Sequence, residues 1–388
     1  MTDPLSSNTS PHTPIHANLP VLKVIGLGGG GQNAVDRMIE LGLSGSEFIA
    51  ANSDAQVLKN SLAPVKIQLG PKVTRGLGAG GDPAIGEAAA EESYAELKNA
   101  LSGADMVFLT CGMGGGTGTG SIPVAANIAR EEGAVVVAIV SMPFSFEIGR
   151  RQANARAGLS KLHQYTDTLI TVPNDRLLQI APKDLPIEMA FRLADDILRQ
   201  GIQGISELVT QPGLINVDFS HVKAMMKNGG GSLLAIGTGQ GENRVNDAME
   251  RALHHPMLES INLENATGII ANFTGGDDLA FTEVVGALNS LQARCGGVAD
   301  IIPGVICDSK MEDRVQVILV LTGLGATSLD QKPAKVEKPL PAPLEEKKDL
   351  SKEDFPFLMN DPLPKDRPES TDPQSDIDIP AFIRRKQR

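Results

Sequence analysis

The feature that most constrains the fold is a run of glycines in residues 111–120 (CGMGGGTGTG), set between two apolar segments. Residues 106–110 before it are predicted to form a buried strand, and residues 122–130 after it a helix. Glycine costs backbone entropy on folding, so a run of this length needs a reason. A tight turn would need only one or two glycines. We therefore predict that backbone N–H groups approach a phosphate at the helix N-terminus.

A second unit of the same kind begins the chain. Residues 21–27 (VLKVIGL) indicate a strand, residues 28–31 are four glycines, and residues 32–41 have the pattern of a helix. Gly26, Gly28 and Gly31 also fit the dinucleotide fingerprint, with Asp54 near the place of its ribose carboxylate. A dinucleotide fold needs only one such loop, whereas this chain has a second and richer one. An NAD-dependent oxidoreductase is therefore the distant alternative.

A third glycine-rich loop, residues 74–82 (TRGLGAGGD), lies between a predicted strand at 66–69 and a helix that starts near Pro83. It resembles a family loop that senses the γ-phosphate of a bound nucleotide, and the alternative is a mobile surface connection, since glycine richness also marks flexibility. The chain contains no G-x-x-x-x-G-K-[ST] motif, so the phosphates must be held by backbone amides, helix ends and a metal ion. Further strands at 47–51 and 134–140 complete an open parallel sheet, with the ligand beyond the carboxyl ends of its strands. Residues 168–173 (TLITVP) are predicted to form another short strand.

Composition limits the class of protein. The 388 residues suffice for two folded domains and a tail, and 41% of them are hydrophobic. A net charge of −12 argues against nucleic acid or an anionic membrane surface as the main partner. Three cysteines are too few for a disulfide framework. Since residues 1–19 lack the apolar core of a signal peptide and no apolar run approaches a membrane span, we expect a soluble cytoplasmic protein without membrane insertion.

The segment GGGTGTG at residues 114–120 resembles the signature of the tubulin and FtsZ superfamily of GTPases, and the resemblance to FtsZ extends over roughly residues 22–325. It implies an α/β fold in which a parallel-sheet nucleotide-binding domain is joined by a long central helix to a smaller α/β C-terminal domain. The expected segments are a disordered N-terminal extension (1–19), a GTP-binding domain (20–185), the connecting helix (186–212), a C-terminal activation and polymerisation domain (213–326), a disordered linker (327–374) and a terminal peptide (375–388).

Two side chains near the start of the long helix are candidates for base recognition. Phe191 and Asp195 are four residues apart, so both can face one ligand. An aromatic ring can stack on a base, and a carboxylate can accept hydrogen bonds from N1–H and the exocyclic amine of guanine, which adenine cannot offer. This pair predicts GTP over ATP. The alternatives are a core position for Phe191 and a solvated charge for Asp195.

The resemblance extends the nucleotide site to other positions. It makes Asn33 a second reader of the base, Glu147 a ribose contact and Arg151 a phosphate or nucleotide contact. Residues 143–151 (PFSFEIGRR) are predicted to enter a helix, where Glu147 and Arg151, four apart, share a face. The alternative for these two residues is an intrahelical ion pair on a solvated surface. The predicted cofactors are GTP and GDP with Mg²⁺, and K⁺ is a second candidate ion. The complete predicted nucleotide set is Gly28, Gly29, Gly30, Gly31, Gln32, Asn33, Gly78, Ala79, Gly80, Gly114, Gly115, Gly116, Thr117, Gly118, Thr119, Glu147, Arg151, Phe191 and Asp195.

The loop after the long helix, residues 213–222 (GLINVDFSHV), resembles the FtsZ loop that reaches into the nucleotide site of the next subunit. There it places an Asn and two acidic residues over the γ-phosphate. Asn216 and Asp218 match the first two positions, whereas His221 occupies the second acidic one. Imidazole can accept a proton but brings no negative charge when neutral, so turnover is expected to be slow. His221 could act as a general base, could order water, or could be a solvated loop residue, and Asp218 could also cap the following helix.

The rest of the chain suggests assembly rather than further chemistry. Strands are predicted at 232–237, 268–274, 299–307 and 315–322, and the adjacent His254 and His255 lack metal-ligand spacing, so no metal site is predicted. After about residue 327 the chain is proline-rich and charged, which predicts a disordered linker. Its last segment begins at Asp376 and ends at Arg388 (DIDIPAFIRRKQR). This segment resembles the FtsZ peptide that binds membrane-tethering and regulatory division proteins.

Together these features resemble a bacterial cell-division GTPase. The resemblance implies head-to-tail filaments, GTP hydrolysis at the contact between subunits, and a division-site (Z) ring at mid-cell that recruits the septum machinery. A contact between two different surfaces of successive copies generates such filaments when the copies do not close into a ring. The nearer alternatives are a tubulin-like paralogue that acts in cell shape and a scaffold that holds GTP without hydrolysing it.

Overall fold

The computed structural model describes residues 20–147, 149–179, 185–210, 217–227, 230–255, 258 and 263–324. The predictions for the N-terminal extension, for Asn216, for the linker and for the terminal peptide lie outside these residues.

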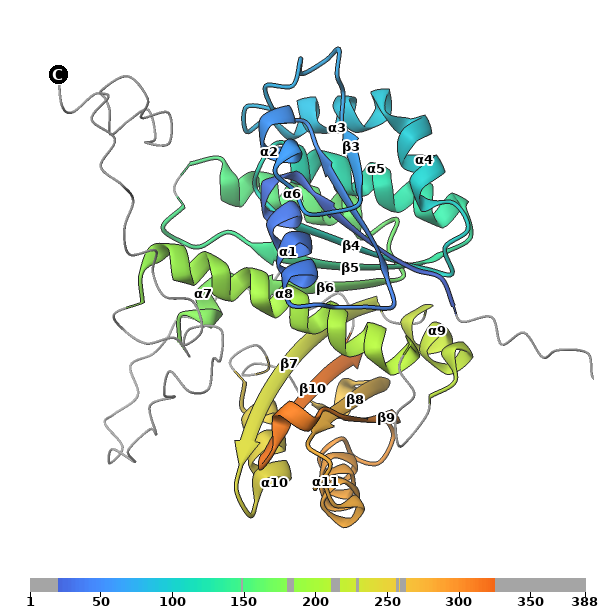
Figure 1. Ribbon diagram of the computed structural model, residues 1–388, viewed down its shortest axis with the longest axis vertical. Coiled ribbons are helices and arrows are strands. Elements are labelled where there is room, and N and C mark those ends of the chain that lie inside the picture. The colour runs from blue at the N-terminus through green and yellow to red at the C-terminus, as the bar shows by residue number, and fades with distance from the viewer. Residues whose placement is uncertain are drawn as a thin grey trace, which may run out of the picture. The chain divides into compact units, whose positions relative to one another are not determined.

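A single sheet of ten strands runs through the described chain in the order β3-β2-β1-β4-β5-β6-β7-β10-β8-β9 (Figure 1). The first six of these pair in parallel, β7 pairs in parallel with β6, and β10 pairs antiparallel with both β7 and β8. The strands are β1 (Leu22–Leu27), β2 (Glu47–Asn52), β3 (Val65–Gln68), β4 (Met106–Gly112), β5 (Val135–Met142), β6 (Thr168–Pro173), β7 (Gly230–Gln240), β8 (Gly268–Gly275), β9 (Asp300–Cys307) and β10 (Arg314–Thr322).

The predicted fold class is confirmed: an N-terminal domain built on a parallel sheet precedes a smaller α/β C-terminal domain. The central strands β4 and β5 are buried along almost their whole length, as apolar runs covered on both faces should be. The helices are α1 (Gly28–Glu40), α2 (Ala55–Lys59), α3 (Pro83–Glu92), α4 (Tyr94–Leu101), α5 (Thr117–Glu131), α6 (Arg151–Leu162), α7 (Asn174–Leu177), α8 (Ile187–Thr210), α9 (Phe219–Lys227), α10 (Arg244–Leu253) and α11 (Phe281–Arg294).

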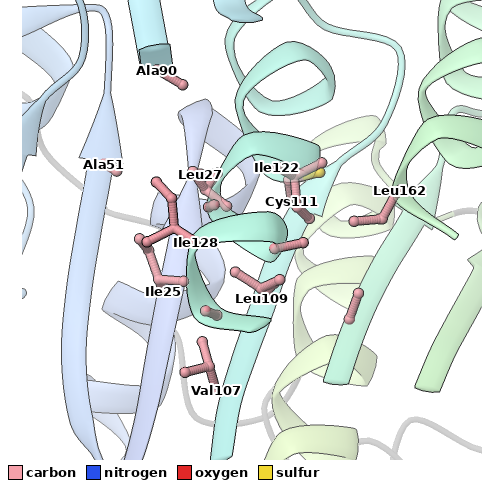
Figure 2. Packing of buried hydrophobic residues seen from close by; sticks show 14 of the residues in the cluster. Ile25, Leu27, Ala51, Ala90, Val107, Leu109, Cys111, Ile122, Ile128 and Leu162 are labelled. Carbon is pink, nitrogen blue, oxygen red and sulfur yellow. The ribbon is translucent and has the colours of Figure 1, made fainter. Parts of the chain in front are cut away.

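The main core of the N-terminal domain lies between the sheet and α5. Figure 2 shows Ile122 and Ile128 of α5 beside Ile25, Leu27 and other strand residues in one buried cluster. On the other side of the sheet α1 packs beside α8 (Figure 1). Helices on both faces leave the carboxyl ends of the parallel strands as the place where loops can form a site.

The long helix α8 has 24 residues, which corresponds to about 36 Å. Its C-terminal half packs tightly on the C-terminal domain through two glycines. A Cβ on Gly201 would lie 2.8 Å from Leu234 of β7, and a Cβ on Gly204 would lie 2.9 Å from Ile318 of β10. A larger residue at either position would force the Leu234 or Ile318 side chain to shift, so these glycines allow this half of α8 to pack closely on the C-terminal domain.

Two helix boundaries differ from the sequence prediction. Helix α1 begins at Gly28 rather than near Gln32, so the glycines form its first turn instead of a separate loop. Gly28 has φ +68, a conformation that glycine adopts without strain and that lets the chain turn directly from β1 into the helix. Helix α6 begins only at Arg151, so Glu147 lies in the turn before it and the two do not share a helix face.

No helix of the described chain is long and apolar enough to cross a lipid bilayer.

Candidate functional site

The first two glycine segments meet at the carboxyl ends of the adjacent strands β1 and β4. A Cβ on Gly28 would lie 2.7 Å from the amide nitrogen of Gly118, and one on Gly30 would lie 3.1 Å from that of Gly112. Contacts this close exclude any side chain. The glycines therefore allow two helix N-termini, those of α1 and α5, to lie against each other.

Among the described residues, neither helix has a side-chain cap, since the cap positions are Leu27 for α1 and Gly116 for α5 and neither makes a cap hydrogen bond. Helices α2 and α3, in contrast, do have side-chain caps. Asp54 accepts from the amides of Gln56 and Val57 in α2, and Asp82 accepts from the amide of Ala84 in α3. Uncapped amides at two adjoining N-termini carry the positive ends of two helix dipoles. That arrangement suits a polyphosphate.

The third glycine loop reaches the same place. A Cβ on Gly116 would meet the amide nitrogen of Asp82 at 2.8 Å and the Cβ of Ala79 at 2.9 Å. Gly78 and Gly80 both have positive φ, which turns the loop through conformations that other residues rarely adopt. The structure thus brings together all three predicted glycine loops.

Two predicted glycines face open space rather than protein. A Cβ added at Gly29 or Gly115 would have no heavy atom within 4 Å, and neither residue has a positive φ. Packing within the chain therefore does not explain why these positions are glycine. Room for a ligand close to the backbone explains it.

Three polar residues of the predicted set are engaged inside the protein. The Gln32 side chain is buried and donates to the Val57 carbonyl at 2.9 Å, so only its backbone is available to a ligand. The hydroxyl of Thr119 accepts from the Gly114 amide at 2.8 Å, and that of Thr117 lies 2.5 Å from the Ser53 hydroxyl. The side chains of Thr117 and Thr119 hold the glycine loop at residues 111–120 in shape.

An aromatic cluster stands at the start of α8. Phe191 is 39% exposed and packs edge-on against buried Phe144, with ring centroids 5.3 Å apart. Phe144 in turn stacks on Phe146, which is 47% exposed. Phe191 is therefore not a plain core residue, because its half-exposed ring, nearly perpendicular to that of Phe146, offers apolar surface to a base. The sequence reasoning missed Phe144 and Phe146, although the PFSF segment after β5 carries both.

Asp195 is partly buried one turn further along α8. Burial raises the pKa of its carboxyl to about 7, and the charge of the neighbouring Asp196 adds to the rise. A carboxylate that has lost its water gains more from two hydrogen bonds to a base than a solvated one does. Asn33 on α1 is exposed, and α1 packs against α8.

Asn174 is a further candidate that the sequence reasoning missed. It follows the carboxyl end of β6, is 4% exposed, and its Oδ1 has no hydrogen-bond partner within the described part of the chain. A buried polar atom of this kind usually finds a partner in a ligand or a water molecule. Only its position after the predicted strand at 168–173 could have pointed to it.

Glu147 and Arg151 form an ion pair across the turn that leads into α6. The other oxygen of Glu147 accepts from the Phe144 amide at 2.8 Å, which ties this pair to the aromatic cluster. The Glu147 side chain is 9% exposed whereas that of Arg151 is 56% exposed. The ion pair that was the alternative for these two residues exists, and the guanidinium is the more exposed of its two groups.

The described residues of the predicted hydrolysis loop lie in a different part of the structure from the glycine loops. Asp218 is exposed and accepts from the Ser220 amide at 2.9 Å, so it caps α9, and that bond holds its pKa below the usual range. Asp218 and His221 line a groove of about 880 Å³ with residues of the C-terminal domain, among them Thr267, Asp300 and Ile302. Asn216 lies outside the described residues.

One molecule therefore does not unite the two predicted halves of the site. Phe191 and Asp195 are in the N-terminal part of α8, and Asp218 follows beyond its end at Thr210, so about 22–29 Å of helix separates them along this element. None of the described residues that line the groove belongs to a glycine loop.

The carboxylate that the dinucleotide alternative requires has a role within the fold. Asp54 Oδ1 accepts from the amides of Gln56 at 2.9 Å and Val57 at 3.1 Å, as the cap of α2. One of its two oxygens is therefore engaged in capping a helix.

The family assignment follows from sequence and structure comparisons. The model of the GTPase domain of the Tubulin/FtsZ family matches residues 21–182, and that of the C-terminal domain of the FtsZ family matches residues 230–325. The empty FtsZ dimer of M. jannaschii is 44% identical, with a TM-score of 0.77, over 79% of this chain and 89% of that one.

More distant structures share the fold. CetZ2 of Haloferax volcanii, solved as a GTPgS-bound protofilament, is 20% identical with a TM-score of 0.67, over 79% of this chain and 94% of that one. CetZ1 of the same organism, a GDP-bound monomer, is 20% identical with a TM-score of 0.69, over 79% and 96%. The glycine loops, the sheet order and these matches agree, and the chain belongs to the Tubulin/FtsZ family of GTPases, with both domains of FtsZ.

Proposed function

We propose that the chain binds GTP at the three glycine loops and assembles head to tail, so that each contact between copies completes one hydrolysis site. The observation that carries this proposal is the separation of the two half-sites by more than half the length of α8. A second copy stacked end to end would bring its Asp218 and His221 to the nucleotide of the first. The FtsZ dimer and the CetZ2 protofilament among the similar structures support such self-association.

Each group of residues then has a defined task. The amides of the three glycine loops hold the phosphates, with Arg151 as a nearby cation. Phe191, with Phe146 beside it, stacks on the base. Asp195 and Asn33 read the base, Glu147 contacts the ribose, and Asn174 supplies a further polar contact. The bound phosphates would carry Mg²⁺, which neutralises charge on them; K⁺ is a second candidate ion.

Hydrolysis requires a water molecule to be oriented toward the γ-phosphate. Asp218 of the incoming copy brings a carboxylate whose pKa is held low, so it is ionised at neutral pH and suits this orientation. Asn216 is proposed to assist. His221 supplies no fixed negative charge, and turnover slower than with a second carboxylate follows from that difference.

At the level of the cell, we propose that the filaments form the division-site ring at mid-cell and recruit the septum machinery. The residues from Asp376 to Arg388 are proposed to bind membrane-tethering and regulatory division proteins. The 44% identity to FtsZ over most of the chain favours this role over that of a CetZ-like paralogue, for which identity is 20%. A scaffold that holds GTP without hydrolysing it is the second candidate, and His221 is the observation that favours it.

Light scattering and phosphate release on the purified chain with GTP, ATP and NAD test the proposal. We expect a rise in scattering and release of phosphate with GTP alone. Assembly without phosphate release would favour the scaffold, and binding of NAD without assembly would favour the oxidoreductase.

A further inference from the structure

The central helix carries a buried polar chain that leads from the base-reading residues to the C-terminal domain. Asp196, next to Asp195, is 2% exposed. One of its oxygens accepts from Arg199 Nε at 2.7 Å and the other from Gln200 Nε2 at 2.5 Å. Both oxygens of this carboxylate are thus bound within α8.

This series of hydrogen-bonded side chains continues from α8 into the C-terminal domain. Gln200 is 9% exposed, and its Oε1 accepts from Gln316 Nε2 at 2.9 Å. Gln316 belongs to β10, 116 residues further along the sequence. Because the Gln200 amide donates at one end and accepts at the other, its orientation is fixed by both partners.

These hydrogen bonds lie near the middle of α8, between its two halves. Beyond them, Gly201 and Gly204 fix the C-terminal half of the helix against β7 and β10. Before them lie Phe191 and Asp195, the residues proposed to contact the base. The Asp196–Gln200–Gln316 chain therefore sits where the half held by the C-terminal domain meets the half that reads the base.

We propose that Gln316 is a positioning residue for base recognition: through Gln200 and Asp196 it fixes the turn of α8 that presents Asp195 to guanine. This inference rests on the proposed function, and it assigns to the C-terminal domain a part in nucleotide selectivity. If β10 shifts against α8, a buried amide loses its partner, and such a loss is costly enough to couple the two elements.

The readout must report base recognition rather than stability. Inosine triphosphate differs from GTP only by lacking the exocyclic amine that the Asp195 carboxylate accepts from. The ratio of GTP to inosine triphosphate affinity therefore measures how well Asp195 is placed, whereas general loosening of the site weakens both nucleotides alike.

The experiment measures this ratio on the full chain by competition, together with the melting temperature, for the wild type, Gln316→Leu, Gln200→Leu and the double variant. Asn272→Leu is the matched control, because Asn272 of β8 also donates an amide hydrogen bond to α8, at the Gly204 carbonyl (3.1 Å), with no link to Asp196. We expect each glutamine variant to lower the ratio by about fivefold, the double variant to lower it no further, and the control to leave it unchanged.

Two results overturn the inference. If Gln316→Leu lowers the melting temperature but leaves the ratio unchanged, Gln316 is only structural. If the two single effects add, the residues do not act as one chain. A wild type that binds no GTP overturns the proposed function and this inference together, whereas a wild type with normal GTP binding and unaffected ratios overturns the inference alone.

Discussion

Gly28 and Gly118, ninety residues apart in the sequence, approach so closely that a Cβ on the first would lie 2.7 Å from the amide nitrogen of the second. This contact lets the N-termini of α1 and α5 share one site. The neighbouring glycines that face open space, Gly29 and Gly115, mark the side from which a ligand would approach.

Gly29→Ala tests whether this glycine is required for ligand binding rather than for folding. Its added methyl group meets nothing in the chain, so the melting temperature should hold, but it would stand where phosphates approach the backbone. We expect GTP affinity to fall at least about tenfold, from one displaced charged hydrogen bond. Gly286→Ala is the control, since Gly286 is an equally open helical glycine in α11. Equal GTP affinity in both variants would contradict the proposed phosphate position.

Phe191→Ala removes the proposed stacking surface. Stacking of an aromatic ring on a base contributes about 1–3 kcal/mol, which predicts GTP affinity weaker by roughly 5- to 150-fold. Phe281→Ala, which truncates the 69% exposed Phe281 in the C-terminal domain, should leave nucleotide affinity of the monomer unaltered. Equilibrium binding below the assembly concentration measures both. Unchanged affinity for Phe191→Ala would show that the ring does not contact the base.

The raised pKa of Asp195, about 7 against 3.8 for the ordinary group, predicts opposite effects on stability and binding. A carboxyl whose pKa is raised in the folded state favours folding below its unfolded pKa, and that contribution is lost as pH rises toward 7. Asp195→Asn should therefore raise the melting temperature of the nucleotide-free chain at pH 8 more than at pH 4.

Guanine recognition needs the ionised form of the same group. Wild-type GTP affinity should fall by about tenfold from pH 8 to pH 6, because protonation removes an acceptor, and it should be nearly flat in Asp195→Asn. Melting curves and binding measured over this range test both parts. Equal slopes in the two proteins would mean that another group controls the pH dependence.

The sequence was sufficient for the parts of the site that repeat a local pattern. Glycine runs after apolar segments predicted all three loops, and the spacing of Phe191 and Asp195 predicted a shared helix face. Local patterns could not reveal contacts made by tertiary packing. The ring of Phe146 and the unpaired oxygen of Asn174 become candidates only when β5, β6 and α8 lie together.

Two of the sequence predictions were wrong about where a helix begins, and each error has a physical cause. The helix predicted from Gln32 starts at Gly28, because helix propensity penalises glycine although glycine is what permits this close N-terminus. The spacing of Glu147 and Arg151 suggested a helical pair, but α6 begins only at Arg151 and the pair closes across a turn. Predictions for Asn216, the linker and the terminal peptide stay predictions.

The substitution at the hydrolysis loop gives a direct test of His221. His221→Asp should raise the rate of phosphate release, because it restores a fixed negative charge beside Asp218. Ser220→Asp is the control, since it adds a carboxylate one residue away, on the same exposed turn of α9. A rate for His221→Asp at or below that of the wild type would count against a charge requirement at this position.

The division of the site between two copies can be tested by mixing. Gly29→Ala should disable the nucleotide half and Asp218→Ala the hydrolysis half, and each protein alone should release phosphate slowly. An equimolar mixture should recover part of the wild-type rate, since an intact loop of one copy can meet an intact nucleotide site of the other. If the mixture only averages the two rates, the halves act within one molecule.

The most direct measurement is the GTP hydrolysis rate per molecule as a function of protein concentration. If a neighbouring copy completes each site, the rate per molecule is near zero at low concentration and rises steeply where light scattering begins. A rate per molecule that stays constant across that range, with no rise in scattering, would show that one chain hydrolyses GTP alone and would contradict the account.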